Sequence, residues 1–78
     1  MSHKRGEAAE LRSIYRRGDR VLVELESGFY VLVIQTSEIA GGELWLHAAG
    51  FGFEFGTSFR AKCIVRRLRR GEVLIWRK

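Results

Sequence analysis

The sequence predicts an all-β fold class: a small antiparallel barrel of five or six strands with a short N-terminal helix. The chain has 78 residues, which is the size of one small domain. From residue 20 onward, apolar and polar side chains alternate with the period of two that is typical of half-buried strands. Glycines separate these runs and the chain contains no proline. Closing many short strands into a barrel leaves no strand edge exposed.

The first expected element is a helix over residues 7–17, which ends before Gly18. Acidic side chains come early in this segment and arginines come late, as the helix dipole favours, and glycine is common directly after a helix. The segment also carries apolar residues at helical spacing, namely Ala8, Leu11, Ile14 and Tyr15. We therefore predict a flexible N-terminal tail over residues 1–6 and a single domain over residues 7–78.

Strand-like segments follow, each bounded by glycine or polar residues. They cover residues 20–25, 29–36, 43–49, the glycine-punctuated stretch 50–58, 59–68 and 72–78, with SEIAGG as the connection over residues 37–42. The second segment, FYVLVIQT, is apolar on both faces. We expect this strand to be central in the sheet, or covered on its outer side by the helix or by another subunit.

The charges of the chain are separated along its length. Residues 1–20 have a net charge of +3, residues 21–59 of −5 and residues 60–78 of +7, which together give +5. Such segregation indicates an anionic partner such as a nucleotide, a nucleic acid or a phospholipid, unless the fold brings the segments together and neutralises them. The densest basic run is RRLRR, whose arginines attract phosphate or solubilise the end of a strand: Arg66, Arg67, Arg69 and Arg70.

Residues that perform chemistry are sparse, so we expect a non-enzymatic binding module without a cofactor or metal. Asp19 is the single aspartate, His47 lies on a strand without an evident partner, and Cys63 lies on the apolar side of its strand. The chain shows no phosphate-binding glycine loop, paired carboxylates or zinc-ligand spacing. No apolar run is long enough to cross a bilayer, and the polar N-terminus is unlike a secretory signal, which favours a cytoplasmic location.

The stretch AGFGFEFG resembles the core of the RNA-binding octapeptide of RRM and cold-shock domains. In a strand, Phe51, Phe53 and Phe55 would share one face, on which bases could stack. Gly56, however, stands where the octapeptide has an aromatic residue, and the flanking segments have strand character where an RRM has helices. We therefore expect these three phenylalanines to be core or subunit-contact residues.

The segment RRGDRVLVEL resembles the RxxxR motif and first strand of PilZ domains, and EIAGGELWL is similar to their second motif, [D/N]xSxxG. The segments FGTSFRAKCIV and GEVLIW are similar to two later strands of the family. PilZ domains are six-stranded barrels that bind cyclic di-GMP, so the resemblance implies that Arg16, Arg17 and Arg20 hold that nucleotide. It also implies that the second motif cradles the other side of the nucleotide with Glu38, Ala40, Gly41 and Gly42. Ala40 replaces the family's serine, and Glu43 its final glycine.

A second family fits parts of the same sequence. RVLVELESG is similar to the opening of the first motif of Sm-like proteins, and LRRGEVLI to the turn of their second motif. This resemblance implies an SH3-like barrel that forms a homo-oligomeric ring and binds RNA phosphates through its arginines. A third alternative is a protein-interaction module that has lost nucleotide binding and uses the apolar stretch at residues 45–53 as its contact surface.

Overall fold

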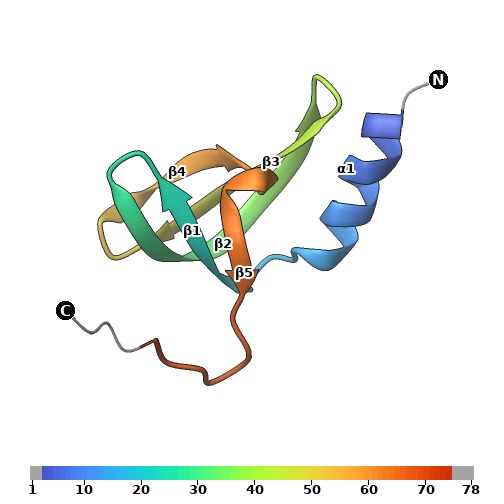
Figure 1. Cartoon of the computed structure of the whole chain (residues 1–78). Helices are drawn as coiled ribbons and strands as arrows, with labels where there is room; N and C mark the ends of the chain where they lie inside the picture. The colour runs from blue at the N-terminus through green and yellow to red at the C-terminus, as the bar shows by residue number, and fades with distance from the viewer. Residues whose placement is uncertain (1–2, 75–78) are drawn as a thin grey trace.

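In a computed structural model, which describes residues 3–74, the chain forms one antiparallel sheet and one α-helix (Figure 1). The elements in chain order are α1 (His3–Ile14), β1 (Arg20–Leu25), β2 (Gly28–Ala40), β3 (Glu43–Gly50), β4 (Phe53–Arg60), the 3₁₀ helix η1 (Ala61–Cys63) and β5 (Ile64–Arg67). The strands lie in the order β4-β3-β2-β1-β5, and each neighbouring pair is antiparallel. The predicted β-rich class with a short N-terminal helix is therefore confirmed. Among the described strands, the pairing leaves β4 and β5 as the two ends of an open sheet.

The helix lies closer to the N-terminus than predicted. α1 begins at His3 and ends at Ile14, so residues 3–6 are helical and residues 15–17 belong to the connection to β1. The reason is a competing acceptor, because the backbone N–H of Arg16 donates to the carboxylate of Asp19 at 3.0 Å. The Asp19 side chain therefore ends the helix before Gly18 is reached.

β2 is the longest strand, and it joins the two halves of the sheet. It pairs with β1 through residues 28–33 and with β3 through residues 33–40, with a bulge early in the second pairing. Gly41 and Gly42 have φ values of 60° and 78° and form the two-residue turn into β3. The predicted connection is thus wrong for residues 37–40, which belong to the strand because a turn built from two glycines needs no further residues.

The segment 59–68, predicted as one strand, is divided in the structure. β4 ends at Arg60, η1 follows, and β5 begins at Ile64. The interruption arises because β4 and β5 lie at opposite ends of the sheet, so one continuous strand cannot belong to both. Of the last predicted strand, residues 72–74 are not in a strand and residues 75–78 lie outside the described residues.

One face of the sheet forms the hydrophobic core. Its buried residues come mainly from alternating positions of β1, β2 and β3, with contributions from α1, β4 and η1: Ala8, Val21, Val23, Leu32, Ile34, Leu44, Leu46, Ala48, Phe59 and Ala61. Full burial of one large aliphatic side chain contributes about 1.5–3 kcal/mol to stability. β2 is central, as predicted for a strand that is apolar on both faces. α1 packs on the core face, where Ala8 joins the cluster, and so does not cover the outer face of β2.

Candidate anion-binding site

Two basic segments that are far apart in the sequence meet at one end of the molecule. β1 pairs with β5, with Val21 opposite Arg67, and the backbone N–H of Leu68 donates to the carbonyl of Arg20 at 2.9 Å. This pairing places the loop before β1 beside the loop after β5. Six predicted site residues lie on these loops and at the adjoining strand ends, and we call them the arginine cluster: Arg16, Arg17, Arg20, Arg67, Arg69 and Arg70.

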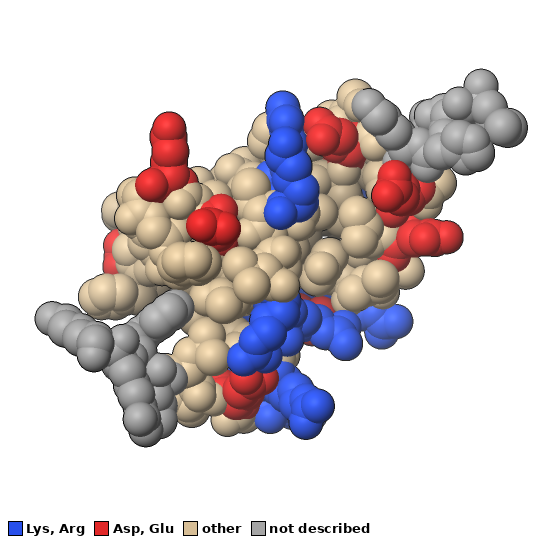
Figure 2. All heavy atoms as spheres, in the orientation of Figure 1, with Lys and Arg blue, Asp and Glu red and all other residues tan. Residues whose placement is uncertain are grey.

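The two loops hold a positive charge equal to the net charge of the whole chain. Residues 16–20 and 66–72 contain seven arginines and two acidic residues, which gives +5, and the remaining seven basic and seven acidic residues cancel. In Figure 2, basic side chains gather on the lower part of the molecule, and most acidic ones lie above them. The fold therefore does not neutralise the basic segments with the acidic middle segment, and a positively charged surface of this kind attracts anions.

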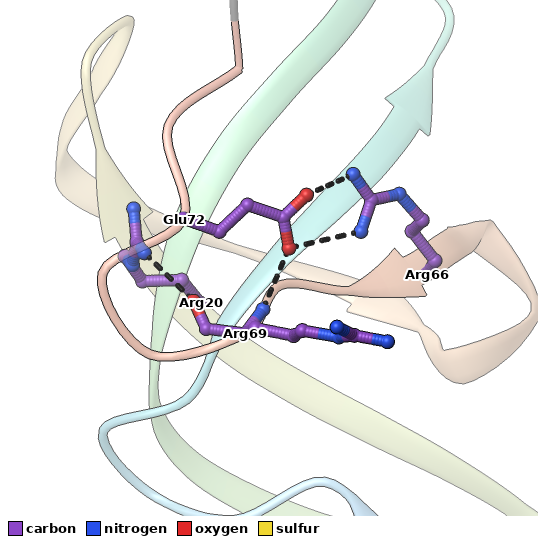
Figure 3. A network of polar contacts seen from close by, with 4 residues as sticks. All are labelled: Arg20, Arg66, Arg69 and Glu72. Atoms are coloured by element: carbon purple, nitrogen blue, oxygen red, sulfur yellow. Dashed lines mark hydrogen bonds and ion pairs between the residues drawn. The ribbon is translucent and has the colours of Figure 1, made fainter.

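Two members of the arginine cluster hold the loops in place. Arg67 donates to the carbonyl of Ile14 at the end of α1 at 2.9 Å, where a cation also complements the helix dipole. Its guanidinium lies 3.8 Å from the carboxylate of Asp19. Arg20 donates to the carbonyl of Arg69 at 3.1 Å (Figure 3). These contacts connect α1, β1 and the loop after β5.

Other members project into solvent. Arg17 and Arg70 are exposed, and neither side chain forms a hydrogen bond or ion pair within residues 3–74. Arg16 uses its Nε, which donates to the carbonyl of Ser13 at 3.2 Å, so that its terminal nitrogens remain available. Guanidinium groups with available N–H donors bind phosphate oxygens in a bidentate manner and stack on bases.

A carboxylate closes the loop after β5. Both oxygens of Glu72 accept hydrogen bonds from the guanidinium of Arg66, and one also accepts the backbone N–H of Arg69 at 2.8 Å (Figure 3). The hydrogen bond from Arg66, followed by that from Arg69, lowers the pKa of Glu72 to about 2. The backbone N–H of Glu72 in turn donates to the carbonyl of Arg69 at 2.9 Å. We call this arrangement of Arg66, Arg69 and Glu72 the Glu72 hook.

The structure does not bring the second PilZ-like motif to the arginine cluster. The residues of this motif lie at the end of β2 and in the turn that follows: Glu38, Ala40, Gly41 and Gly42. Arg20 pairs with Val33, so Ala40 lies seven residues farther along β2, which corresponds to about 23 Å of extended strand. The β2–β3 turn instead lies beside α1, where Gly42 lines a cleft together with Glu7, Ala8 and Leu11 (Figure 1). The predicted ligand residues thus occupy two separate places.

A further group of polar and aromatic residues, which sequence reasoning missed, lies on the outer face of β3 and β4. His47 Nδ1 lies 3.1 Å from the hydroxyl of Ser58, its direct cross-strand partner. Beside this pair, the guanidinium of Arg60 lies 5.1 Å from the centre of the Trp45 ring. Among the described residues, His47 hydrogen-bonds to no carboxylate, so no triad of the Ser-His-Asp type is formed there. Only the hairpin register could have revealed these pairs.

The three phenylalanines of AGFGFEFG have different environments. Phe53 is half-buried and packs edge-to-face on Tyr30, with 4.7 Å between the ring centres. Phe51 lies in the β3–β4 turn and is 92% exposed, and Phe55 on β4 is 100% exposed. The prediction of a core position is wrong for Phe51 and Phe55, and a role in subunit contact stays a prediction. Cys63 is half-buried and packs against the core, as expected of a small apolar residue.

Comparisons with known proteins do not assign the chain to a family. No protein-family model, curated protein or solved structure matches it. Across the described residues, no helix is long and apolar enough to cross a membrane. The same part of the chain contains no group of three or more His, Cys, Asp or Glu residues that could hold a metal ion. The function therefore has to be inferred from the geometry and charge of the molecule.

Proposed function

We propose that this protein is a non-enzymatic module that binds the phosphate groups of single-stranded RNA through the arginine cluster. The observation that carries the proposal is the convergence of six arginines from two distant segments on one end of the molecule. Arg20 and Arg67 hold the loops, while Arg16, Arg17 and Arg70 present available N–H donors. Such a surface binds a phosphate backbone without reading its sequence.

The topology favours the Sm-like or SH3-like reading of the sequence. A short helix precedes β1, five strands lie in the order β4-β3-β2-β1-β5, and η1 connects the two end strands. We infer that the sheet curls around its core face into a partly open barrel, since β2 pairs with β1 and β3 through successive halves and carries a bulge. In an oligomeric ring, the end strands β4 and β5 would offer their edges to neighbouring copies.

Cyclic di-GMP is the competing ligand that the PilZ resemblance implies. Arg16 lies in the loop before β1 and Arg20 is the first residue of that strand, as an RxxxR clamp needs. The second motif, however, lies at the far end of β2, about 23 Å of extended strand beyond the residue that pairs with Arg20. Glu43, which stands at the final-glycine position of that motif, also places a carboxylate at the turn, where its oxygen lies 3.4 Å from Nε of Arg60. These two features favour a phosphate backbone, which needs the arginine cluster alone, over a compact dinucleotide held from both sides.

Fluorescence anisotropy with a labelled single-stranded RNA oligonucleotide tests the proposal. We expect binding to weaken when Arg17 and Arg70 are changed to glutamine, because two positive charges that contact phosphate are removed. The variant should remain folded, because these two exposed side chains make no hydrogen bond or ion pair within residues 3–74. Lys62→Gln is the matched control, since it removes one exposed positive charge from η1, outside the arginine cluster. Equal affinities for wild type, the double variant and the control would contradict the proposal.

Calorimetric titration with cyclic di-GMP separates the two ligand classes. Stoichiometric binding of this nucleotide that is lost in Arg16→Ala and in Glu38→Ala would support the PilZ reading and refute ours. Sedimentation or light scattering then gives the mass in solution. A mass several times that of the 9.0 kDa chain would support the ring that the Sm-like reading implies.

A further inference from the structure

The outer face of β2, β3 and β4 carries two rows of side chains in register. The buried residues of β3 point into the core, so Trp45 and His47, which alternate with them, lie on the opposite face. Each of the two has a direct cross-strand partner on both neighbouring strands. The rows are Glu38, Trp45 and Arg60, and Thr36, His47 and Ser58. We call these six residues the Trp45 surface.

An open hollow of about 340 Å³ lies on the Trp45 surface, close to the lower limit of about 300 Å³ for sites that take small ligands. His47 leaves room for it by leaning over β4, where Nδ1 lies 3.1 Å from the hydroxyl of Ser58. A Cβ at position 56 would collide with Nε2 of His47, so Gly56 is what permits this position of the ring. The Arg60 guanidinium lies 5.1 Å from the centre of the Trp45 ring but does not line the hollow. The hollow therefore meets the face of the indole that Arg60 does not cover.

The chemistry of the hollow suits a neutral nucleobase. An indole face stacks on any base, because every base has a π-face. The indole N–H of Trp45 forms no hydrogen bond within residues 3–74, and the hydroxyls of Thr36 and Ser58 can each donate or accept. The carboxylate of Glu38 makes no ion pair in the same part of the chain. Its charge repels a phosphate but not a base, so it favours a base in the hollow.

The arginine cluster reaches the same face of the sheet. Arg20 precedes the buried Val21 on β1 and therefore lies on the outer side. Arg20 pairs with Val33, which in turn pairs with Ala49 on β3, so two strand spacings of about 5 Å separate Arg20 from β3. Trp45 lies four residues from Ala49, about 13 Å along the strand, and hence about 17 Å from Arg20. A short RNA strand spans this distance along one continuous face.

We infer that an RNA strand held by the arginine cluster continues across the outer face of the sheet and places one base in the hollow, stacked on Trp45. The inference rests on the proposed function and adds an uncharged contact to it. The arginines bind phosphates, whereas Trp45 binds a base of any sequence. The protein therefore prefers single-stranded RNA to a polyanion without bases and to a duplex, whose bases are already stacked.

Fluorescence anisotropy with two labelled RNA strands of equal length tests the inference. One strand carries its bases, and in the other a stable abasic spacer replaces every base while all phosphates remain. We expect wild-type protein to bind the first strand about tenfold more tightly, the effect of one stacked base. Trp45→Leu should remove this preference without changing the salt dependence, since it removes no charge. Phe55→Leu is the matched control, because Phe55 is a fully exposed aromatic residue of β4 outside the hollow, and it should behave as wild type.

The failure of this inference differs from the failure of the proposed function. Salt-sensitive binding of equal strength to both strands, or a preference for bases that survives in Trp45→Leu, would overturn base stacking at Trp45 and leave the arginine cluster as the RNA site. Absence of binding to either strand would refute the proposed function together with this inference. A shallower salt slope for Trp45→Leu would also contradict the inference, since it would show that phosphate contacts were lost.

The emission of Trp45 provides a second measurement that leaves the hollow unaltered. In a Trp76→Phe background, Trp45 is the single tryptophan of the chain. We expect its fluorescence to be quenched at saturation with the base-bearing strand and to change little with the abasic strand. Equal emission with both strands would place the bases elsewhere on the protein. Far-UV circular dichroism verifies that each variant is folded.

Discussion

Substitution of Asp19 by asparagine should strengthen RNA binding while leaving the fold intact. Asp19 accepts the backbone N–H of Arg16 at 3.0 Å and lies 3.8 Å from the guanidinium of Arg67. Asparagine keeps a side-chain oxygen that accepts the N–H but removes the negative charge from the middle of the arginine cluster. The two functions of this carboxylate are thereby separated.

The magnitude follows from the position of a phosphate that contacts the remaining N–H donors of Arg67, whose guanidinium lies 3.8 Å from the Asp19 carboxylate. Such a phosphate lies about 8 Å from the Asp19 carboxylate, and two unit charges at that distance in water repel by about 0.5 kcal/mol. Removal of the repulsion strengthens binding about twofold at low salt, and screening reduces the effect toward 0.15 M salt. Anisotropy titrations at two salt concentrations measure this change directly.

Asp19→Ala provides the comparison, because alanine removes both the charge and the hydrogen-bond acceptor. We expect it to lower the free energy of unfolding by about 0.5–1.5 kcal/mol, the usual contribution of one hydrogen bond, whereas Asp19→Asn lowers it less. Unchanged or weaker RNA binding by a fully folded Asp19→Asn protein would refute the electrostatic reasoning.

Three further predictions concern the fold and the hook. Leu32→Ala should lower the free energy of unfolding by about 2–5 kcal/mol, because Leu32 is fully buried in the central strand; urea denaturation measures this, and a loss below about 1 kcal/mol would contradict the assigned core. Gly50→Ala should cost about 1–3 kcal/mol in the same assay, since its Cβ would lie 2.6 Å from the backbone carbonyl oxygen of Val31, whereas Gly6→Ala, with no atom within 4 Å of the new Cβ, should not destabilise. The folded-state pKa of Glu72 is about 2, below its ordinary value of 4.5, so the stabilisation by the hook is present above pH 4.5 and is lost as the pH falls through 2. An NMR titration of the Glu72 carboxyl group checks this, and a midpoint near 4.5 would show that the contact with Arg66 is absent.

Much of the fold could be predicted from the period of the sequence. Alternation of apolar residues identified β1 and β3, and the two-faced apolar run identified β2 as central, because burial imposes these patterns locally. The end of α1 could not be predicted, since the acceptor that stops it is a side chain of the following loop. The division of residues 59–68 also escaped, because strand order, and not local pattern, requires a crossing between the two ends of the sheet.

The candidate site shows the same division between local and distant information. The RRGDR and RRLRR segments were each recognisable as basic, and the charge segregation predicted an anionic partner. Their convergence depends on the pairing of β1 with β5, and the separation of Ala40 from Arg20 depends on the length of β2. Neither could be read from spacing along the chain. The position of Ser58 opposite His47 likewise depends on the register of the β3–β4 hairpin.

The salt dependence of RNA binding tests the central claim most directly. For single-stranded RNA, the logarithm of the affinity falls with the logarithm of the salt concentration with a slope of about −0.7 per phosphate contact. We expect a wild-type slope of about −2 to −4 from three to six arginine contacts, a slope shallower by about 1.4 for Arg17→Gln combined with Arg70→Gln, and the wild-type slope for Lys62→Gln. A slope near zero, or one slope shared by all three proteins, would contradict the assignment of RNA binding to the arginine cluster.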